Sequence, residues 1–301
     1  MVTHQGLVYR RCRKEDLPAF VRLILRTADD LRGRTGKEPF RWRPRSVPEI
    51  FAHLRGTDPG TFLCAWSGRR LAGVAGAVIR GKQWYLCWLF VDRRYQDRGV
   101  GRELLRRAWR EGPGMSHALG TFTYNQQAVG LYTSFGMLPH EFLTLMEGAS
   151  GKIRVPGPTR LDVSEGADRR DVAWINDLEK EIRGHARPPE WSLWSRSDSF
   201  RVLLFRKGGR RVGYGMIGPR DEVHPVGVVS AAYLPDALSE TIRAAVGLGR
   251  KKVRLICPNS NRELYRFAHG LGLRNVEMLV FMTDEPCGDF SRYVPAPLAV
   301  F

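Results

Sequence analysis

The residues from Gln96 to Gly101 have the types and the position to bind an anion. They follow a strongly apolar stretch, Leu86 to Val91, and they precede Arg102 to Arg110, where apolar side chains recur at helical spacing. The first backbone N–H groups of a helix have no intrahelical partner and lie at its positive end, so they bind phosphate groups well. Glycine at positions 99 and 101 removes the Cβ atoms that would block the anion. The segment predicts a strand, a turn and a helix start that hold a pyrophosphate.

A second segment, Asn125 to Met137, decides whether this turn is an ordinary connection or a ligand site. A glycine pair alone also occurs in plain strand-to-helix turns. Asn125 follows an apolar run that ends in Phe122, Thr123 and Tyr124, and Asn is a favoured residue just before a helix. The order of elements is therefore strand, loop, helix, strand, and then a helix that carries Tyr132.

Together the two segments resemble the GNAT superfamily of acyl-CoA N-acyltransferases. Gln96, Gly99 and Gly101 match the (Gln/Arg)-x-x-Gly-x-(Gly/Ala) loop of that family. The family's Asn-x-x-Ala-x-x-Leu-Tyr-x-x-Phe-Gly-(Met/Phe) helix is matched by Asn125, Ala128, Leu131, Tyr132, Phe135, Gly136 and Met137. Tyr9 to Leu17 looks like the opening strand and the acidic first helical turn of such domains. The resemblance covers roughly residues 7 to 147.

The resemblance implies an acetyl-CoA-dependent N-acetyltransferase that passes an acetyl group to a primary amine by direct attack, with acetyl-CoA as co-substrate and no metal. The expected cofactor contacts are Leu89, Phe90, Val91, Gln96, Asp97, Arg98, Gly99, Val100, Gly101, Arg102 and Asn125. The strand that ends at Val91 would splay from its neighbour at a bulge and pair with the pantetheine amides. A backbone N–H near Leu89 or Phe90 would stabilise the oxyanion of the tetrahedral intermediate.

Tyr132 is the candidate general acid. A phenol with a pKa of about 10 stays protonated at neutral pH and is well matched to a thiolate leaving group. Two structural alternatives stay open: Tyr132 as a core residue of an amphipathic helix, and Asn125 as a simple helix cap.

The general base is not assigned. Many relatives carry a glutamate on the strand before the loop, but residues 83–91 contain no carboxylate here, and Cys87 lies roughly where that glutamate would be. Deprotonation of the amine through ordered water, deprotonation by Glu38 and an acceptor that is already partly neutral are the alternatives.

The length and an internal repeat predict two domains. A chain of 301 residues is long for one domain, and residues 149–158 form a Gly- and Pro-rich linker. A shift of 136 residues places a second set on the helix motif: Asn261, Leu264, Phe267, Leu271, Gly272 and Leu273. We expect an α/β fold of two tandem GNAT-like domains, 1–148 and 159–301, each a twisted mixed sheet flanked by helices.

The second domain lacks the residues that the chemistry needs. Tyr132 falls on Ala268 in this register, and the predicted strand Val226 to Leu234 runs into a helix that begins with Pro235 and has no glycine pair. We expect a degenerate, non-catalytic copy that serves packing, dimerisation or the shape of the acceptor cleft.

The net charge of +17 is compatible with nucleic acid, an acidic membrane surface or an acidic substrate. Nucleic acid is not expected, because 40 of the 48 cations are arginine, a bias that genome composition also produces. The densest cluster, residues 32–45, is either a solvated loop or, by the resemblance, an acceptor-site loop that favours an acidic or phosphorylated amine. The expected partner is a small-molecule or peptide amine, and a homodimer is left open.

Cysteine, histidine and apolar patterns add exclusions. The five cysteines include no Cys-x-x-Cys pair and the histidines have no metal-ligand spacing, so neither a disulfide framework nor a metal site is predicted. No apolar run is long enough for a membrane span or a signal peptide, so a cytoplasmic protein is expected. The rival interpretation is a non-catalytic protein that senses acyl-CoA or binds nucleic acid, which the missing strand carboxylate and the positive charge favour.

Overall fold

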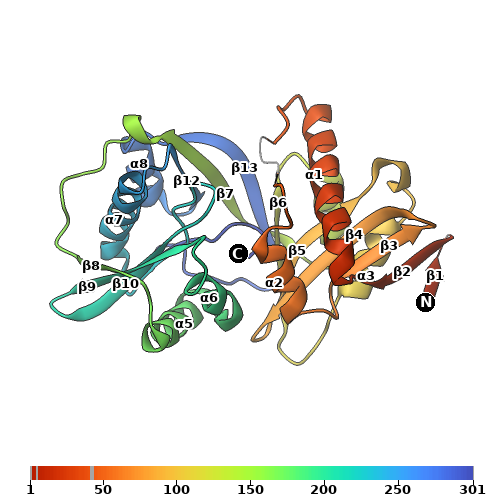
Figure 1. Cartoon of the computed structure of the whole chain (residues 1–301), viewed down its shortest axis with the longest axis horizontal. Coiled ribbons are helices and arrows are strands. Elements are labelled where there is room, and N and C mark those ends of the chain that lie inside the picture. Colours follow the sequence, from red (N-terminus) through yellow and green to blue (C-terminus); the bar gives the residue numbers. More distant parts are fainter. Residues whose placement is uncertain (1, 5, 41–43, 301) are drawn as a thin grey trace. The chain divides into compact units, whose positions relative to one another are not determined.

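The computed structural model describes residues 2–4, 6–40 and 44–300, which fold into two compact units. The first unit comprises the residues up to Leu119 together with Tyr124–Met137. The second comprises Gly120–Thr123 and the residues from Leu138 onward. Each unit is α/β, with strands flanked by helices (Figure 1), which confirms the predicted fold class.

The sheet of the first unit is mixed. Its strands lie in the order β1-β2-β3-β4-β5-β6. They are β1 (Val2–His4), β2 (Leu7–Arg11), β3 (Leu63–Ser67), β4 (Arg70–Arg80), β5 (Gln83–Val91) and β6 (Ser116–Phe122). Neighbours are antiparallel as far as β5, and β5 pairs with β6 in parallel. The parallel pair requires a crossover, and the predicted loop and helix lie in it.

Helices cover both faces of this sheet. They are α1 (Leu17–Arg34), α2 (Glu49–Thr57), α3 (Val100–Ala108) and α4 (Gln126–Thr133). In Figure 1, α1 and α2 lie in front of β4 and β5, and α3 lies behind them. On the first face Phe20, Phe51 and Trp88 pack ring against ring, with Phe51 stacked on Trp88 at a centroid distance of 4.2 Å. On the other face Leu104 packs close to Gly73, where a Cβ would be only 2.8 Å from it.

The second unit contains two sets of strands. Five strands lie in the order β14-β11-β10-β9-β8, and three lie in the order β13-β7-β12. Their bounds are β7 (Leu138–Ala149), β8 (Asp162–Glu165), β9 (Arg201–Lys207), β10 (Arg210–Ile217), β11 (Val226–Val228), β12 (Lys252–Pro258), β13 (Arg274–Thr283) and β14 (Tyr293–Val294).

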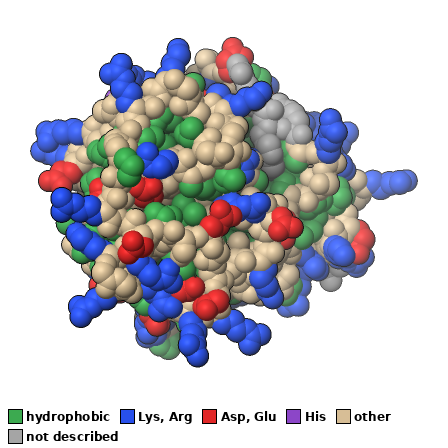
Figure 2. Space-filling model, turned by 60° about the vertical axis from the view of Figure 1, so that its left-hand side comes forward, with side chains coloured by type: hydrophobic (Ala, Val, Ile, Leu, Met, Phe, Trp, Pro, Cys, Tyr) green, Lys and Arg blue, Asp and Glu red, His purple; other side chains and the backbone are tan. Residues whose placement is uncertain are grey.

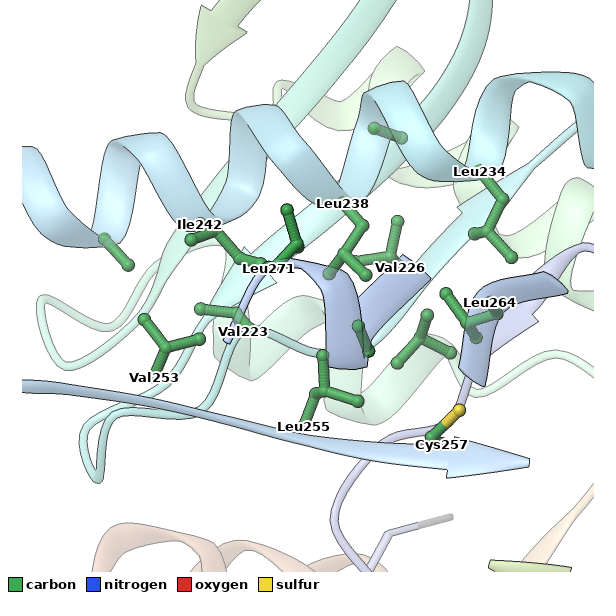
Figure 3. Packing of buried hydrophobic residues seen from close by; sticks show 14 of the residues in the cluster. Val223, Val226, Leu234, Leu238, Ile242, Val253, Leu255, Cys257, Leu264 and Leu271 are labelled. Atoms are coloured by element: carbon green, nitrogen blue, oxygen red, sulfur yellow. The ribbon is translucent and has the colours of Figure 1, made fainter. Parts of the chain in front are cut away.

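The described residues of this unit also form the helices α5 (Arg169–Arg183), α6 (Pro188–Trp194), α7 (Leu234–Gly247) and α8 (Arg262–Gly270). Figure 3 shows its core, in which Leu238 and Ile242 of α7 point toward Val253 and Leu255 of β12. The apolar positions recur along α7 at the spacing of one helical face, so this face is buried. Short 3-10 turns occur in both units. They are η1 (Lys14–Asp16) and η2 (Arg93–Tyr95) in the first unit, and η3 (Ser150–Lys152) and η4 (Ala231–Tyr233) in the second.

The compact units do not divide the chain at the linker. Strand β7 pairs antiparallel with both β12 and β13, so the residues from Leu138 onward belong to the second unit. Residues 153–161, within or next to the expected linker, contain no helix or strand. The limits 1–148 and 159–301, inferred from the repeat, stay a prediction about how the chain was duplicated.

The 136-residue repeat is visible in backbone detail. Asn125 and Asn261 both cap the start of their helix, and Gly136 and Gly272 both end the turn after it with positive φ, 89° and 100°. The predicted strand from Val226 to Leu234 was wrong in extent. Strand β11 ends at Val228, because Tyr233 N bonds to Ser230 O and turns the chain into α7 before Pro235.

None of the described helices has both the length and the apolar character needed to cross a membrane.

Candidate functional site

Strand β5 has an unpaired edge over its second half. It pairs with β4 along its whole length, with a register shift at Cys87, but it pairs with β6 only from Gln83 to Leu86. No described strand pairs with the other edge of Cys87–Val91. The predicted bulge and splay are therefore present. An open strand edge offers N–H and C=O groups to any extended chain that carries amides.

The turn after β5 is held by side chains. Gln96 Nε2 donates to the Val91 carbonyl over 2.9 Å, and Asp97, which has a positive φ of 59°, accepts from Gln127 Nε2 over 2.5 Å. Gln127 lies on α4, so this bond ties the loop to the second predicted motif. Gln96 and Asp97 thus shape the loop from within, and their predicted contact with a cofactor stays a prediction.

Helix α3 begins where the loop motif predicts. Gly99 is its N-cap, has a φ of 70° in the left-handed region and supplies no side-chain cap. The backbone N–H groups of Val100, Gly101 and Arg102 are then the first amides of the helix, which point toward an acceptor outside it. Arg98 and Arg102 have exposed side chains beside them, so the helix start is surrounded by positive charge.

Gly101 lies where β5, α3 and α4 meet. A Cβ at this position would be 3.6 Å from Val91 and 3.8 Å from Leu131. The strand edge, the helix start and the helix that carries Tyr132 are therefore neighbours within one unit. The sequence motifs, which are more than 20 residues apart, form one site.

Tyr132 is buried, with 5% of its surface exposed, and burial raises the pKa of its phenol well above the ordinary value. No described residue forms a hydrogen bond with its hydroxyl. Its oxygen is not among the fully buried polar atoms that lack a partner, so the hydroxyl remains accessible. The side chain is thus protonated and has a free donor to offer to a ligand.

Asn125 acts as a helix cap and retains a free donor. Its Oδ1 accepts from Ala128 N at 3.4 Å, which supports the capping interpretation. Its Nδ2 bonds to none of the described residues. Next to it, Lys37 Nζ lies 4.9 Å from the ring centroid of Tyr124. The loop after α1 therefore reaches this end of the site. Arg41, Trp42 and Arg43 of the basic cluster lie outside the described residues.

Asp92 is a site residue that the motifs missed. It follows β5 directly and is 3% exposed. Burial disfavours its charged form, but hydrogen bonds from Arg94 and the charge of Arg26 outweigh burial and lower the pKa of the carboxyl. Its Oδ1 accepts from Arg94 N and caps η2. In the sequence, the position of this aspartate between an apolar run and two arginines could have indicated its role in the turn. Because it is ionised and paired, Asp92 orders the loop and is a poor base.

The described part of the structure assigns no general base. Cys87 is half-buried at the bulge, and Glu38 is exposed. One set of metal-capable atoms, from Cys12, Asp16 and Cys64, lies within 4.8 Å in the first unit. Its carboxylate is already bound by Arg10, at 2.5 and 2.8 Å, and accepts from Arg13 N. Spacing rules did not find this cluster because its cysteines come from different strand regions.

Comparisons with known proteins bear on the family and the fold. Residues 27–137 match the acetyltransferase (GNAT) family. A search among curated proteins gave no match. A Pyrococcus horikoshii protein assigned as a candidate acetyltransferase has a similar structure, with a TM-score of 0.79 at 19% identity, over 100% of this chain and 98% of that one.

Two further structures cover most of both chains. A GCN5-related N-acetyltransferase from Sphaerobacter thermophilus has a TM-score of 0.67 at 17% identity, over 100% of each chain. A tandem GNAT protein from the clavulanic acid biosynthesis pathway has a TM-score of 0.57 at 15% identity, over 93% of this chain and 99% of that one. At such identities the likeness concerns the fold. Residues 27–137 thus match the acetyltransferase (GNAT) family, and the chain as a whole has the fold of a tandem GNAT protein.

Proposed function

We propose that the first unit transfers the acetyl group of acetyl-CoA to a primary amine. The open edge of β5, which leads directly into the start of α3, is the observation that carries the proposal. Pantetheine carries two amides on an extended arm and continues into a pyrophosphate. An edge of backbone groups followed by free helix amides complements that order of groups.

The reaction would follow from this placement. The pantetheine arm along Cys87–Val91 brings the thioester to the bulge, where a backbone N–H of Leu89 or Phe90 donates to the developing oxyanion. The amine nitrogen forms a bond to the carbonyl carbon and loses a proton to a base that is not assigned. The C–S bond then breaks, and the sulfur leaves with the electron pair.

Tyr132 would protonate or hydrogen-bond the departing thiolate. Its raised pKa keeps the phenol protonated throughout the neutral range, and its hydroxyl has no competing partner among the described residues. The same shift makes it a weaker acid than a free phenol, so stabilisation of the thiolate by a hydrogen bond forms part of the role.

The acceptor would be a small-molecule or peptide amine. Lys37 and Arg45 in the loop after α1 favour an amine that also carries an acidic or phosphate group. On the face shown in Figure 2, Lys and Arg side chains are spread out with acidic side chains among them, so this face offers no continuous basic track for nucleic acid.

Two measurements test the proposal. Acetyl-CoA should raise the Tm of the protein, because a ligand that binds only the native state stabilises it. A screen of amines with a thiol-release readout should then identify acceptors. Binding without turnover on any amine would favour an acyl-CoA sensor, and salt-sensitive retention of DNA would favour the nucleic-acid alternative.

A further inference from the structure

The segment of residues 290–300, here called the closing segment, adds a strand to the second unit. Its strand β14 pairs antiparallel with β11, with Val294 opposite Val226 and Tyr293 opposite Gly227. Val228 N also donates to Arg292 O over 3.1 Å. The edge of β11 that faces away from β10 is therefore occupied.

That edge corresponds to the open edge of β5. Each unit has an antiparallel hairpin, β4–β5 in the first and β10–β11 in the second. The chain also makes a parallel contact with the next strand: β5 with β6 in the first unit, and Glu222, just before β11, with Arg254 of β12 in the second. In the first unit the ladder stops at Leu86, and Cys87–Val91 is left without a strand partner among the described residues. In the second unit the closing segment takes the equivalent place.

The two capping asparagines differ in the partner of their side-chain amide donor. Asn261, which is equivalent to Asn125, donates from Nδ2 to the backbone carbonyls of Phe290 at 2.9 Å and Ser291 at 3.4 Å. The Nδ2 of Asn125 has no such partner within the described residues. Both caps retain the Oδ1 bond to the helix, so the amide donor is the group that the closing segment uses.

Buried charges hold the closing segment in place. Arg187, which is 2% exposed, donates to the Tyr293 hydroxyl over 2.7 Å and to the Val300 carbonyl, and it is paired with buried Glu179 at 2.6 Å. His224 Nδ1 donates to the Pro295 carbonyl over 2.6 Å. Removal of the segment would leave a guanidinium and an imidazole buried without these partners, which is costly. The segment is thus a fixed part of the fold.

We infer that residues 290–296 occupy, in the second unit, the position that an acyl-pantetheine arm takes in the first, so the chain binds one acyl-CoA and not two. The identity of that ligand rests on the proposed function. The segment offers the same chemistry as pantetheine: extended backbone amides along a strand edge and carbonyls for the capping asparagine. The second unit therefore carries a built-in replacement for the ligand that it no longer binds.

A matched pair of variants tests this inference. Serine retains the oxygen that caps a helix but lacks the amide donor. Asn261→Ser should lower the Tm of the free protein by several degrees and leave the Kd for acetyl-CoA unchanged. Asn125→Ser should leave the Tm unchanged and weaken the binding of acetyl-CoA about fivefold, the loss of one hydrogen bond. The reverse pattern, with Asn261→Ser weakening the binding, would overturn the inference.

Hydrogen exchange and calorimetry on the full chain complete the test. Acetyl-CoA should bind with a stoichiometry of one and should slow exchange in a peptide that covers residues 87–91, while the already protected residues 226–229 do not change. A second equivalent bound, or altered exchange at 226–229 or 290–296, would contradict the inference. No binding at all would contradict the proposed function, and the Tm of Asn261→Ser would still show whether the closing segment depends on that donor.

Discussion

Tyr132 combines nearly complete burial with a hydroxyl that bonds to no described protein group. A core tyrosine normally finds a partner for its O–H, since a buried donor without one costs about 1–3 kcal/mol. The Tyr132 oxygen is not among the fully buried polar atoms without a partner, so its donor is available to water in the free protein and to a ligand in the complex.

Tyr132→Phe should separate a donor to the ligand from a core residue. The variant should have a similar Tm, because it removes a hydroxyl that bonds to no described protein group, and an unchanged Kd for acetyl-CoA. Its kcat should fall about 100-fold or more, the usual effect of losing a general acid. Thiol release under saturating acetyl-CoA measures kcat. A lower Tm together with full activity would assign Tyr132 to the core.

His224 should make the second unit sensitive to acid. Burial lowers the pKa of its imidazole to about 4, below the ordinary value of 6.5, so the unfolded chain binds the proton first as the pH falls. The stability that depends on neutral His224 is complete above pH 6.5 and is lost progressively toward pH 4. Between pH 7 and pH 5 this residue alone should lower the free energy of unfolding by about 2 kcal/mol.

Urea denaturation at pH 7 and at pH 5 measures this loss. His224→Gln retains a donor for the Pro295 carbonyl but does not titrate, so its stability should fall less over the same interval. Equal losses in the two proteins would show that other groups cause the acid sensitivity.

At the scale of elements, the start of α3 depends on two glycines with different roles. Gly99 needs its positive φ to enter the helix, whereas Gly101 is a helical residue whose added Cβ would make ordinary contacts with Val91 and Leu131. The loop motif includes both glycines and does not distinguish their roles. The backbone conformation of the structure shows that Gly99 sets the turn and that Gly101 lies in the helix.

Gly99→Ala should lower stability by about 1–2 kcal/mol, the cost of the left-handed conformation for a residue with a Cβ. It should also weaken acetyl-CoA binding, because the amides of Val100 and Gly101 take their direction from this turn. Gly101→Ala is the matched control and should raise stability by up to about 1 kcal/mol. The sequence predicts that a Cβ at this position would block the anion, but in the structure it would make ordinary contacts with Val91 and Leu131, so we expect the Kd to be retained. Thermal unfolding and calorimetric titration measure both. A Kd that is unchanged in Gly99→Ala would exclude the helix start as the phosphate site.

Predictions were best for elements with strong local patterns. The apolar spacing of Leu104, Leu105 and Ala108 predicted α3 within two residues at each end, and Asn125 predicted the start of α4. Short strands were predicted less well. β14 has only Tyr293 and Val294 and is followed by Pro295, so its sequence carries no strand pattern, and its pairing depends on β11, which lies far away in the chain.

At the scale of the whole molecule, the repeat predicted two similar halves but not where their strands pair. Strand β7 belongs by sequence to the first half, yet it pairs with β12 and β13 of the second unit. Strand pairing between distant segments depends on tertiary contacts, which a sequence pattern with a period of two residues does not specify. The place of the candidate site was predictable because its two motifs lie on elements that meet at Gly101, next to Val91 of β5 and Leu131 of α4. The missing base was not, because no carboxylate stands at the expected position.

The positive charge should act on the acceptor rather than on the fold. Replacement of Arg41, Arg43 and Arg45 together by Gln should raise the KM for an acidic acceptor and leave the KM for a neutral one unchanged. The increase should be smaller at high salt. Unchanged kinetics with an acidic acceptor would show that these arginines do not contribute to acceptor binding.

The structure of the protein with acetyl-CoA bound tests the central claim most directly. We expect the pyrophosphate on the amides of Val100, Gly101 and Arg102, the pantetheine arm along Cys87–Val91, and the sulfur within hydrogen-bond distance of the Tyr132 hydroxyl. Acetyl-CoA bound to the second unit in place of the closing segment, or a first unit in which side chains fill the edge of β5, would contradict the account.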